Sequence, residues 1–246
     1  MNKQRWIWSI ILVFIIVVCV STSVTEEGFK SEESPNPFDN VDVIYYINLD
    51  HREDRKKEIL GEFDRMGIQA DKIVKISAIK DAEYGDLGCS KSHVKTIKQF
   101  IKSGKSNCIV FEDDFEFSQE KDVVYELMNA LFDKKVDYDV CMLSANTIEK
   151  KDSEYTFLKR VMNSQTASGY MVNKKFANKL LENFEEGARI LETKKNKKDP
   201  YRGDNCVDQY WKRLMPKSEW YEFSPRLGKQ RKSHSDIQGG VVDYNV

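Results

Sequence analysis

From Val41 onward, short apolar runs of strand length alternate with segments whose apolar residues recur at helical spacing. The spacing of Ile59, Phe63 and Met66, for example, places all three on one face of a helix. The runs expected as strands are residues 43–47, 73–77, 108–111 and 139–143. This alternation predicts an α/β fold with a mostly parallel sheet and helices on both faces, and such sheets bind ligands at the carboxyl ends of their strands.

The composition excludes several classes of protein. The chain has 246 residues and a net charge of -1, with 39 basic against 40 acidic residues, so no basic surplus indicates a nucleic-acid partner. Five cysteines without a Cys-x-x-Cys pair argue against a disulfide scaffold or a structural zinc site. The length is typical of one domain.

The amino-terminal segment carries a hydrophobic run of 15 residues, Trp6–Val20, in which only Ser9 is polar. Two basic residues precede it and four glutamates follow it, which predicts a cytosolic amino end and a luminal body. As a helix, residues 6–24 would rise roughly 28 Å, close to the roughly 30 Å hydrocarbon core. We therefore expect residues 1–24 to be a cytosolic tip and an N-terminal transmembrane signal anchor or, alternatively, a cleaved signal peptide.

The expected organisation follows from this segment. Residues 25–40 are acidic and contain prolines, so we expect a stem there and a catalytic or binding domain over residues 41–246. The predicted location is the membrane, as a single-pass type II protein with its domain in the lumen of the endoplasmic reticulum or a Golgi-like compartment. A cleaved signal would leave the protein secreted or luminal.

The strongest chemical signal is the acidic triplet Glu112-Asp113-Asp114, which directly follows a buried apolar run. Oxygen ligands of this kind suit Mg²⁺ or Mn²⁺, especially a cation shared with substrate phosphates. The alternative is that the strand ends here and its acids enter water. A phosphohydrolase can also place acids after an apolar strand, but it does so after the first strand of the domain, whereas this triplet follows a later one.

Five sequence motifs in this order resemble glycosyltransferase family 25, which contains lipopolysaccharide and procollagen galactosyltransferases. The motifs are Ile47–Arg55, Gly88–His93, Ile109–Asp114, Ser168–Val172 with Ala177–Leu180, and Asp208–Leu214 with the tail at residues 230–237. The tail looks like that of the short single-domain versions found in large DNA viruses. The resemblance covers nearly all of residues 43–238.

The resemblance implies a GT-A fold and a metal-dependent, inverting transfer of a hexose, galactose or glucose, from a UDP-sugar. The acceptor would be a hydroxyl of a protein or glycan, and the cation Mn²⁺ or Mg²⁺. The implied metal ligands are Glu112, Asp113 and Asp114, with Asp236 as a further ligand from the tail. The implied donor-binding residues are Asn48, Asp50, Arg52, Arg55, Ser90, Ser92 and His93.

Several of these residues also have structural interpretations. Asp50 can cap the following helix, and the two arginines can pair with acids along that helix. A helix beginning after Gly88 would offer free backbone N–H groups to an anion, whereas Ser92 and His93 could instead be a cap and a half-buried imidazole. Cys89 is interpreted as a small buried residue.

An inverting transfer needs a general base for the acceptor hydroxyl. Asp208 and Asp204 lie four residues apart and share a helix face, and Asp208 matches the late aspartate of the family. We assign the base to Asp208, with Asp204 as the second catalytic candidate. The structural alternatives are an N-cap for Asp204 and a surface pair with Lys212 for Asp208. Trp211 either stacks on a sugar or belongs to the core.

Two other functions stay open on the same residues. A non-catalytic sugar- or cation-binding module would keep the fold without turnover, and a metal-dependent phosphohydrolase would use the acidic triplet. The cations of residues 226–232 form either a loop that closes over a diphosphate or a solvated surface loop.

Overall fold

The computed structural model describes residues 34–195, 199, 201–235 and 240–242. The chain divides into two units, Met1–Ser34 and Pro35–Val246, and the elements below belong to the second. The expected anchor at residues 1–24 and residues 25–33 of the expected stem lie outside the described residues. No helix within the described ranges combines the length and the apolar character that crossing a bilayer requires.

An eight-stranded sheet forms the centre of this unit, in the order β2-β1-β3-β8-β5-β9-β7-β6. Its strands are β1 (Ile44–Asn48), β2 (Ile73–Ser77), β3 (Asn107–Glu112), β5 (Val140–Met142), β6 (Asn146–Asp152), β7 (Leu158–Gln165), β8 (Gly169–Asn173) and β9 (Trp220–Phe223). β7 and β8 are antiparallel to their neighbours, so the other six strands share one direction. The expectation of a mostly parallel sheet is confirmed.

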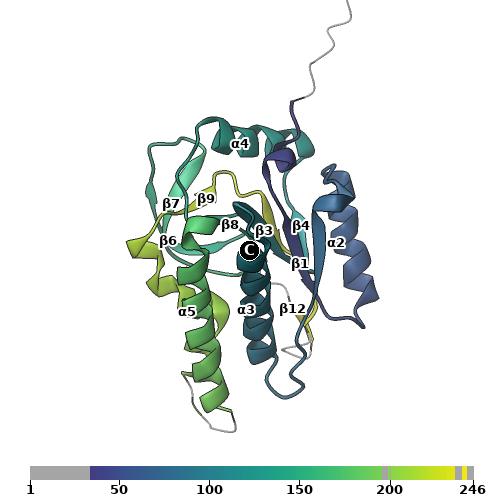
Figure 1. The fold of residues 1–246 in the computed structure, drawn as a ribbon, viewed down its shortest axis with the longest axis vertical. Coiled ribbons are helices and arrows are strands. Elements are labelled where there is room, and N and C mark those ends of the chain that lie inside the picture. Colours follow the sequence, from purple (N-terminus) through teal and green to yellow (C-terminus); the bar gives the residue numbers. More distant parts are fainter. Residues whose placement is uncertain (1–33, 196–198, 200, 236–239, 243–246) are drawn as a thin grey trace, which may run out of the picture. The chain divides into compact units, whose positions relative to one another are not determined.

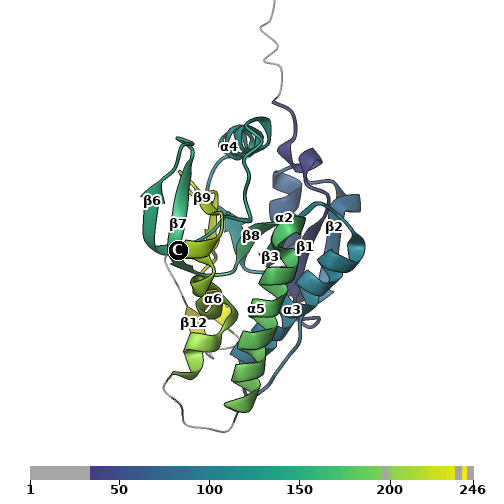
Figure 2. The same ribbon diagram turned by 60° about the vertical axis from the view of Figure 1, so that its left-hand side comes forward.

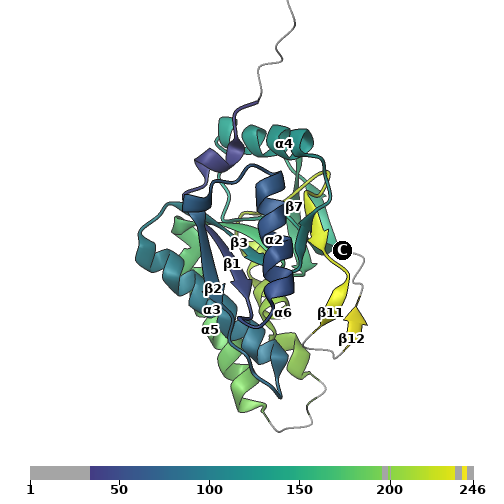
Figure 3. The ribbon, with the colours of Figure 1, turned by 90° about the vertical axis from the view of Figure 1, so that its right-hand side faces the viewer.

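Helices cover both faces of the sheet, as expected (Figures 1 and 2). They are α2 (Glu53–Arg65), α3 (Gly85–Ser103), α4 (Lys121–Asp133), α5 (Lys174–Thr193) and the short α6 (Val207–Tyr210). Side chains of β1 alternate between two cores: Tyr46 packs with residues of α2 and α4, and Tyr45 packs with residues of α3 and α5. Figure 3 views the molecule from the side of α2, with β1 visible next to that helix. Alternation along β1 therefore explains why a five-residue strand is buried throughout.

Short elements complete the fold. Two small ribbons pair β4 (Phe115–Phe117) with β10 (Gly228–Gln230), and β11 (Ser233–Ser235) with β12 (Gly240–Val242). The 3₁₀ turns are η1 (Pro37–Asn40), η2 (Ala70–Lys72), η3 (Arg202–Asn205), η4 (Trp211–Arg213) and η5 (Met215–Lys217). In η1, Phe38 is 1% exposed and packs edge-on against Phe117 and Tyr125. Residues 35–40, which we expected in the stem, therefore belong to the folded unit.

The start of α3 differs from the expectation of a helix beginning after Gly88. The helix begins at Gly85, and the backbone N–H of Gly88 donates to the Tyr84 carbonyl at 3.1 Å. A Cβ at position 88 would lie 2.5 Å from the carbonyl oxygen of Ile79, so only glycine fits this close approach to the neighbouring loop. The N–H groups that we expected to meet an anion are thus used inside the helix.

The strand expected at residues 139–143 is present as β5, whereas β6, β7 and β9 were not predicted from sequence. β6 is largely exposed and rich in charged residues, so it lacks an apolar face. In β7 the buried residues recur every third position, at Leu158, Val161 and Ser164, instead of every second. The β6–β7 pairing contains register shifts around Glu149, which disturb the alternation that identifies a strand.

Candidate active site

The acidic triplet lies at the carboxyl end of β3, where the expected site should be, and its side chains diverge. Glu112 faces α3, with its Oε1 accepting hydrogen bonds from His93 and Cys89 of that helix. Asp113 and Asp114 both contact Arg55 of α2, on the other side of the sheet. Alternation along β3 separates Glu112 from Asp113, and because the strand ends at Glu112 and a turn follows at residues 113–114, Asp114 lies on the same side as Asp113.

Asp113 and Asp114 form a buried carboxylate pair, each 6% exposed. Arg55 lies between them, with its Nη1 2.9 Å from Asp113 and 3.4 Å from Asp114. Asn48 at the end of β1 donates to Asp113 Oδ2 at 2.8 Å. From the tail, the side chain of Gln230 donates to Asp114 Oδ2 at 3.0 Å. Strand β1, helix α2 and the tail thus converge on the pair.

The electrostatics of the pair favour a bound cation. Burial raises the pKa of Asp113, and burial together with the nearby Glu112 charge raises the pKa of Asp114 to about 7. Within the described part of the chain, Asp114 Oδ1 and Asn48 Oδ1 are buried without a hydrogen-bond partner. Hard oxygen atoms left without partners beside two carboxylates are suitable ligands for Mg²⁺ or Mn²⁺. The residues present therefore fit the cation that the sequence resemblance implies.

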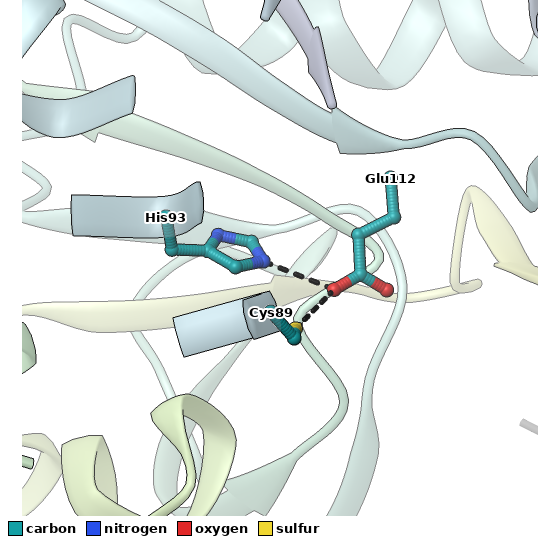
Figure 4. Close-up of side chains that lie close together, drawn as sticks. All are labelled: Cys89, His93 and Glu112. Atoms are coloured by element: carbon teal, nitrogen blue, oxygen red, sulfur yellow. Dashed lines mark hydrogen bonds and ion pairs between the residues drawn. The ribbon is translucent and has the colours of Figure 1, made fainter. Parts of the chain in front are cut away.

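Glu112 belongs to a partly buried polar network with Cys89 and His93 on the opposite side of β3 (Figure 4). His93 Nε2 lies 3.0 Å from Glu112 Oε1, and His93 Nδ1 lies 2.8 Å from the Tyr170 hydroxyl. The Cys89 thiol donates to the same carboxylate oxygen at 3.5 Å. Burial favours the neutral acid, but the contacts with His93, together with the Cys89 hydrogen bond and the Arg55 charge, outweigh it and lower the pKa of Glu112. Glu112 is thus held as a carboxylate.

Asp208 lies near this network, at the first turn of α6. The backbone N–H of Thr166 donates to Asp208 Oδ2 at 3.0 Å. Burial raises the pKa of Asp208 against this hydrogen bond, and the Glu112 charge raises it further. Thr166 has a φ of 78°, which is unfavourable for a β-branched residue. Backbone strain of this kind concentrates at functional sites, so the strained Thr166 supports a functional role for the loop that holds Asp208.

The sequence profile of glycosyltransferase family 25, described as an LPS biosynthesis protein, matches residues 75–191. Residues 75–191, called the family 25 segment below, are similar to glycosyltransferase family 25. The match spans just under half of the chain and includes the acidic triplet, the Cys89–His93 turn of α3 and Tyr170. The resemblance noted from the motifs is thereby confirmed over residues 75–191, and the motifs at Ile47–Arg55 and Asp208–Leu214 lie outside the match. No curated protein sequence matches the chain.

Three solved structures with weak similarity illustrate the range of neighbours. A mannose-1-phosphate geranyltransferase from Thermus thermophilus has 7% identity and a TM-score of 0.42, over 76% of this chain and 58% of the other. A glycosyltransferase involved in the glycosylation of the major capsid of PBCV-1 has 9% identity and a TM-score of 0.43, over 79% and 94%. The protein A197 from STIV has 11% identity and a TM-score of 0.39, over 83% and 99%. With TM-scores below 0.5, these likenesses carry no argument about fold or function.

Just before the family 25 segment, the residues after β1 divide between the site and the surface. Asp50 pairs with Lys75 at 2.8 Å and is exposed, so it does not cap α2, whose N-cap is Arg52 without a side-chain cap bond. Arg52 pairs with Asp54, as the structural alternative had it. Arg55 contacts the carboxylate pair of Asp113 and Asp114.

The two serines of the family 25 segment face inward. Ser90 Oγ donates to the Asp86 carbonyl and accepts from the Val207 N–H at 3.2 Å, which joins α3 to α6. Ser92 Oγ donates to the Gly88 carbonyl and accepts from the Ile79 N–H at 2.8 Å. His93 is fully buried and not half-buried. Both serine hydroxyls therefore hold α3 in position and do not face solvent.

The other residues that the sequence singled out after residue 191 are Asp204, Trp211, the tail cations and Asp236. Asp204 is exposed in η3 and does not cap α6, whose N-cap is Cys206. Trp211 is fully buried against Tyr170, which confirms its core interpretation. The tail cation Arg231 pairs with Glu58 and Glu116. Asp236 lies outside the described residues.

Sequence reasoning missed four contacts of this site: those of Gln230 and Arg55 with Asp114, of Thr166 with Asp208, and of Tyr170 with His93. Tyr170 carried a signal, because it is part of a family motif, but nothing in one sequence paired it with a histidine 77 positions away. The alternation of side chains along β3 could have separated Glu112 from Asp113.

Proposed function

We propose that this protein is a glycosyltransferase with a GT-A fold that transfers a hexose, galactose or glucose, from a UDP-sugar to a hydroxyl of a protein or glycan acceptor. The proposed transfer depends on Mn²⁺ or Mg²⁺ and inverts the anomeric centre. The observation that carries the proposal is the buried Asp113–Asp114 pair at the carboxyl end of β3, inside a family 25 segment. Parallel sheets bind ligands at this edge.

The carboxylate pair and its neighbours would hold the cation and the diphosphate. Asp113 and Asp114 are the proposed metal ligands, and Asn48 and Gln230 fix the orientation of their carboxylates. When bound, the cation would neutralise the negative charge that develops on the leaving nucleoside diphosphate. Arg55 already provides a positive charge at the same place, so it is suited to contact the same phosphates.

Asp208 is the proposed general base. Its Oδ2 is fixed by the Thr166 N–H, and no hydrogen bond among the described residues reaches its Oδ1. That oxygen is therefore the atom proposed to take the proton of the acceptor hydroxyl as the hydroxyl attacks the anomeric carbon. The raised pKa of Asp208 makes the carboxylate a stronger base than an exposed aspartate.

Nucleotide release from a panel of nucleotide sugars tests the proposed reaction. We expect release from UDP-galactose or UDP-glucose that stops with a strong chelator and returns with Mn²⁺, because the Asp113–Asp114 pair needs a cation to offset the diphosphate charge. Hydrolysis of a generic phosphomonoester instead would identify a phosphohydrolase. Donor binding without any turnover would identify a binding module, and full activity in chelator would exclude the metal role.

The proposed location is luminal, with the protein anchored through residues 1–24. The proposal rests on the basic residues before the hydrophobic run and the glutamates after it. Protease added to sealed microsomes should spare everything after the run, and detergent should expose it to cleavage. Digestion of the domain in intact microsomes would contradict both the anchor and the signal-peptide interpretations.

A further inference from the structure

We propose that Cys89, His93 and Glu112 form a second metal site, which binds a borderline-soft divalent cation such as Zn²⁺. The three residues are the one cluster of histidine, cysteine and carboxylate ligand atoms found among the described residues with all atoms within 4.8 Å of one another. Two come from successive turns of α3 and the third from the end of β3 (Figure 4). The site goes beyond the proposed hexose transfer.

The spacing of the ligand atoms is close to that of a zinc site. Zinc bonds of about 2.0–2.3 Å in tetrahedral geometry place ligand atoms roughly 3.3–3.7 Å apart. Here His93 Nε2 lies 3.0 Å from Glu112 Oε1, and Cys89 Sγ lies 3.5 Å from the same oxygen. A cation would enter by widening the first of these distances by a few tenths of an ångström, and the remaining pair, the Cys89 sulfur and a ring nitrogen of His93, lies within 4.8 Å.

The histidine already has the outer partner that metal-bound imidazoles have. The Tyr170 hydroxyl lies 2.8 Å from His93 Nδ1 and can donate or accept, so it can hold the ring with Nε2 directed at the cation. His93 is also stacked on the Tyr170 ring at a centroid distance of 5.7 Å. The imidazole is therefore fixed in orientation before any metal binds.

The chemistry of the ligands separates this site from the carboxylate pair. A thiolate and an imidazole select zinc-like cations, whereas Asp113 and Asp114 offer only hard oxygen atoms. Solvent can reach the cluster, because Cys89 is half-buried and the Glu112 side chain is 20% exposed. With three protein ligands the fourth position is left for water. Binding releases the Cys89 thiol proton to solvent.

Cobalt absorption tests the proposal on the full chain, freed of metal beforehand. We expect one equivalent of Co²⁺ to produce a thiolate-to-cobalt charge-transfer band together with the visible absorption of tetrahedral cobalt, and Zn²⁺ to displace it. Cys89→Ser should abolish the charge-transfer band, and Tyr170→Phe should keep it while weakening affinity roughly 10- to 100-fold. Cys206→Ser is the matched control, because Cys206 is also a half-buried free thiol but lies outside the cluster.

Further variants distinguish cobalt binding at this cluster from binding at the carboxylate pair or at another cysteine. Asp114→Asn should leave the cobalt band unchanged, since Asp114 is not in the cluster. Absence of a charge-transfer band in the wild type would show that the cluster is only a hydrogen-bond network. A band that survives Cys89→Ser but disappears with Cys206→Ser would place the thiolate ligand elsewhere. None of these measurements uses transferase activity, so they stand whether or not the proposed reaction is correct.

Discussion

Asp114→Asn is expected to reduce turnover by at least about 10³-fold, because the amide keeps the shape of the side chain but loses the charge that holds the cation. Asp114 is buried and contacts Arg55, so the expected loss of turnover reports on the carboxylate pair. Steady-state nucleotide release at saturating Mn²⁺ measures it. Near-normal turnover in the variant would exclude Asp114 as a metal ligand.

The same substitution should stabilise the metal-free protein at high pH. Burial and the Glu112 charge raise the pKa of Asp114 to about 7, so the folded state binds this proton more tightly than the unfolded state does. Stability from this group is therefore present at low pH and is lost as the pH rises through about 7. Asparagine has no charge to bury, so Asp114→Asn should have a higher Tm than wild type at pH 8, and the difference should shrink toward pH 5.

Asp152→Asn is a matched control for this pH dependence. Asp152 is exposed on β6, and its hydrogen bond from Lys159 lowers the pKa of its carboxyl. A group with a lowered pKa changes stability with pH in the opposite direction. Its contribution to folding stability is present at high pH and is lost as the pH falls. We expect a small effect on Tm that does not favour the variant at pH 8. Thermal unfolding in chelator across pH 5–8 compares both variants, and equal behaviour would contradict the burial argument.

The first half of the sheet was predictable because β1 and β3 are buried on both faces and its strands are separated by regular amphipathic helices. The strand expected at residues 73–77 coincides with β2, and α3 ends at Gly104, whose φ of 72° suits glycine. The second half departs from simple periodicity. β6 exposes nearly all its residues, and the buried positions of β7 recur every three residues.

The candidate site was predictable in location but not in geometry. The acidic triplet after an apolar run identified the end of β3, and one sequence could not show that Arg55 of α2 and Gln230 of the tail meet at Asp114. Those contacts depend on how distant elements pack. The separation of Glu112 from Asp113 follows from the geometry of any strand, so it was available from the sequence, whereas the place of Asp114 depends on the turn that ends β3.

Asp208→Asn is expected to lower kcat by roughly two to four orders of magnitude, the range for loss of general-base assistance, while donor and Mn²⁺ affinity stay nearly unchanged. Burial and the Glu112 charge raise the pKa of Asp208, so the acid limb of the wild-type kcat/KM profile should lie above the usual aspartate range. The direction of this pH dependence follows from the role of Asp208 as a general base. A base works only when it is deprotonated, so activity falls as the pH drops through its pKa. The variant should lose this limb.

Asp204→Asn controls for damage to the same segment, because Asp204 lies four residues earlier, exposed in η3, which the extended backbone of Cys206 separates from α6. It does not cap α6, so its replacement should change the free energy of unfolding by no more than about 0.5 kcal/mol and leave the rate intact. If the Asp208 variant keeps its turnover and the Asp204 variant is inactive, the two assignments are reversed. If both remain active, the base lies elsewhere, and the strained Thr166 backbone that holds Asp208 serves the packing of α6 against β7 instead of proton transfer.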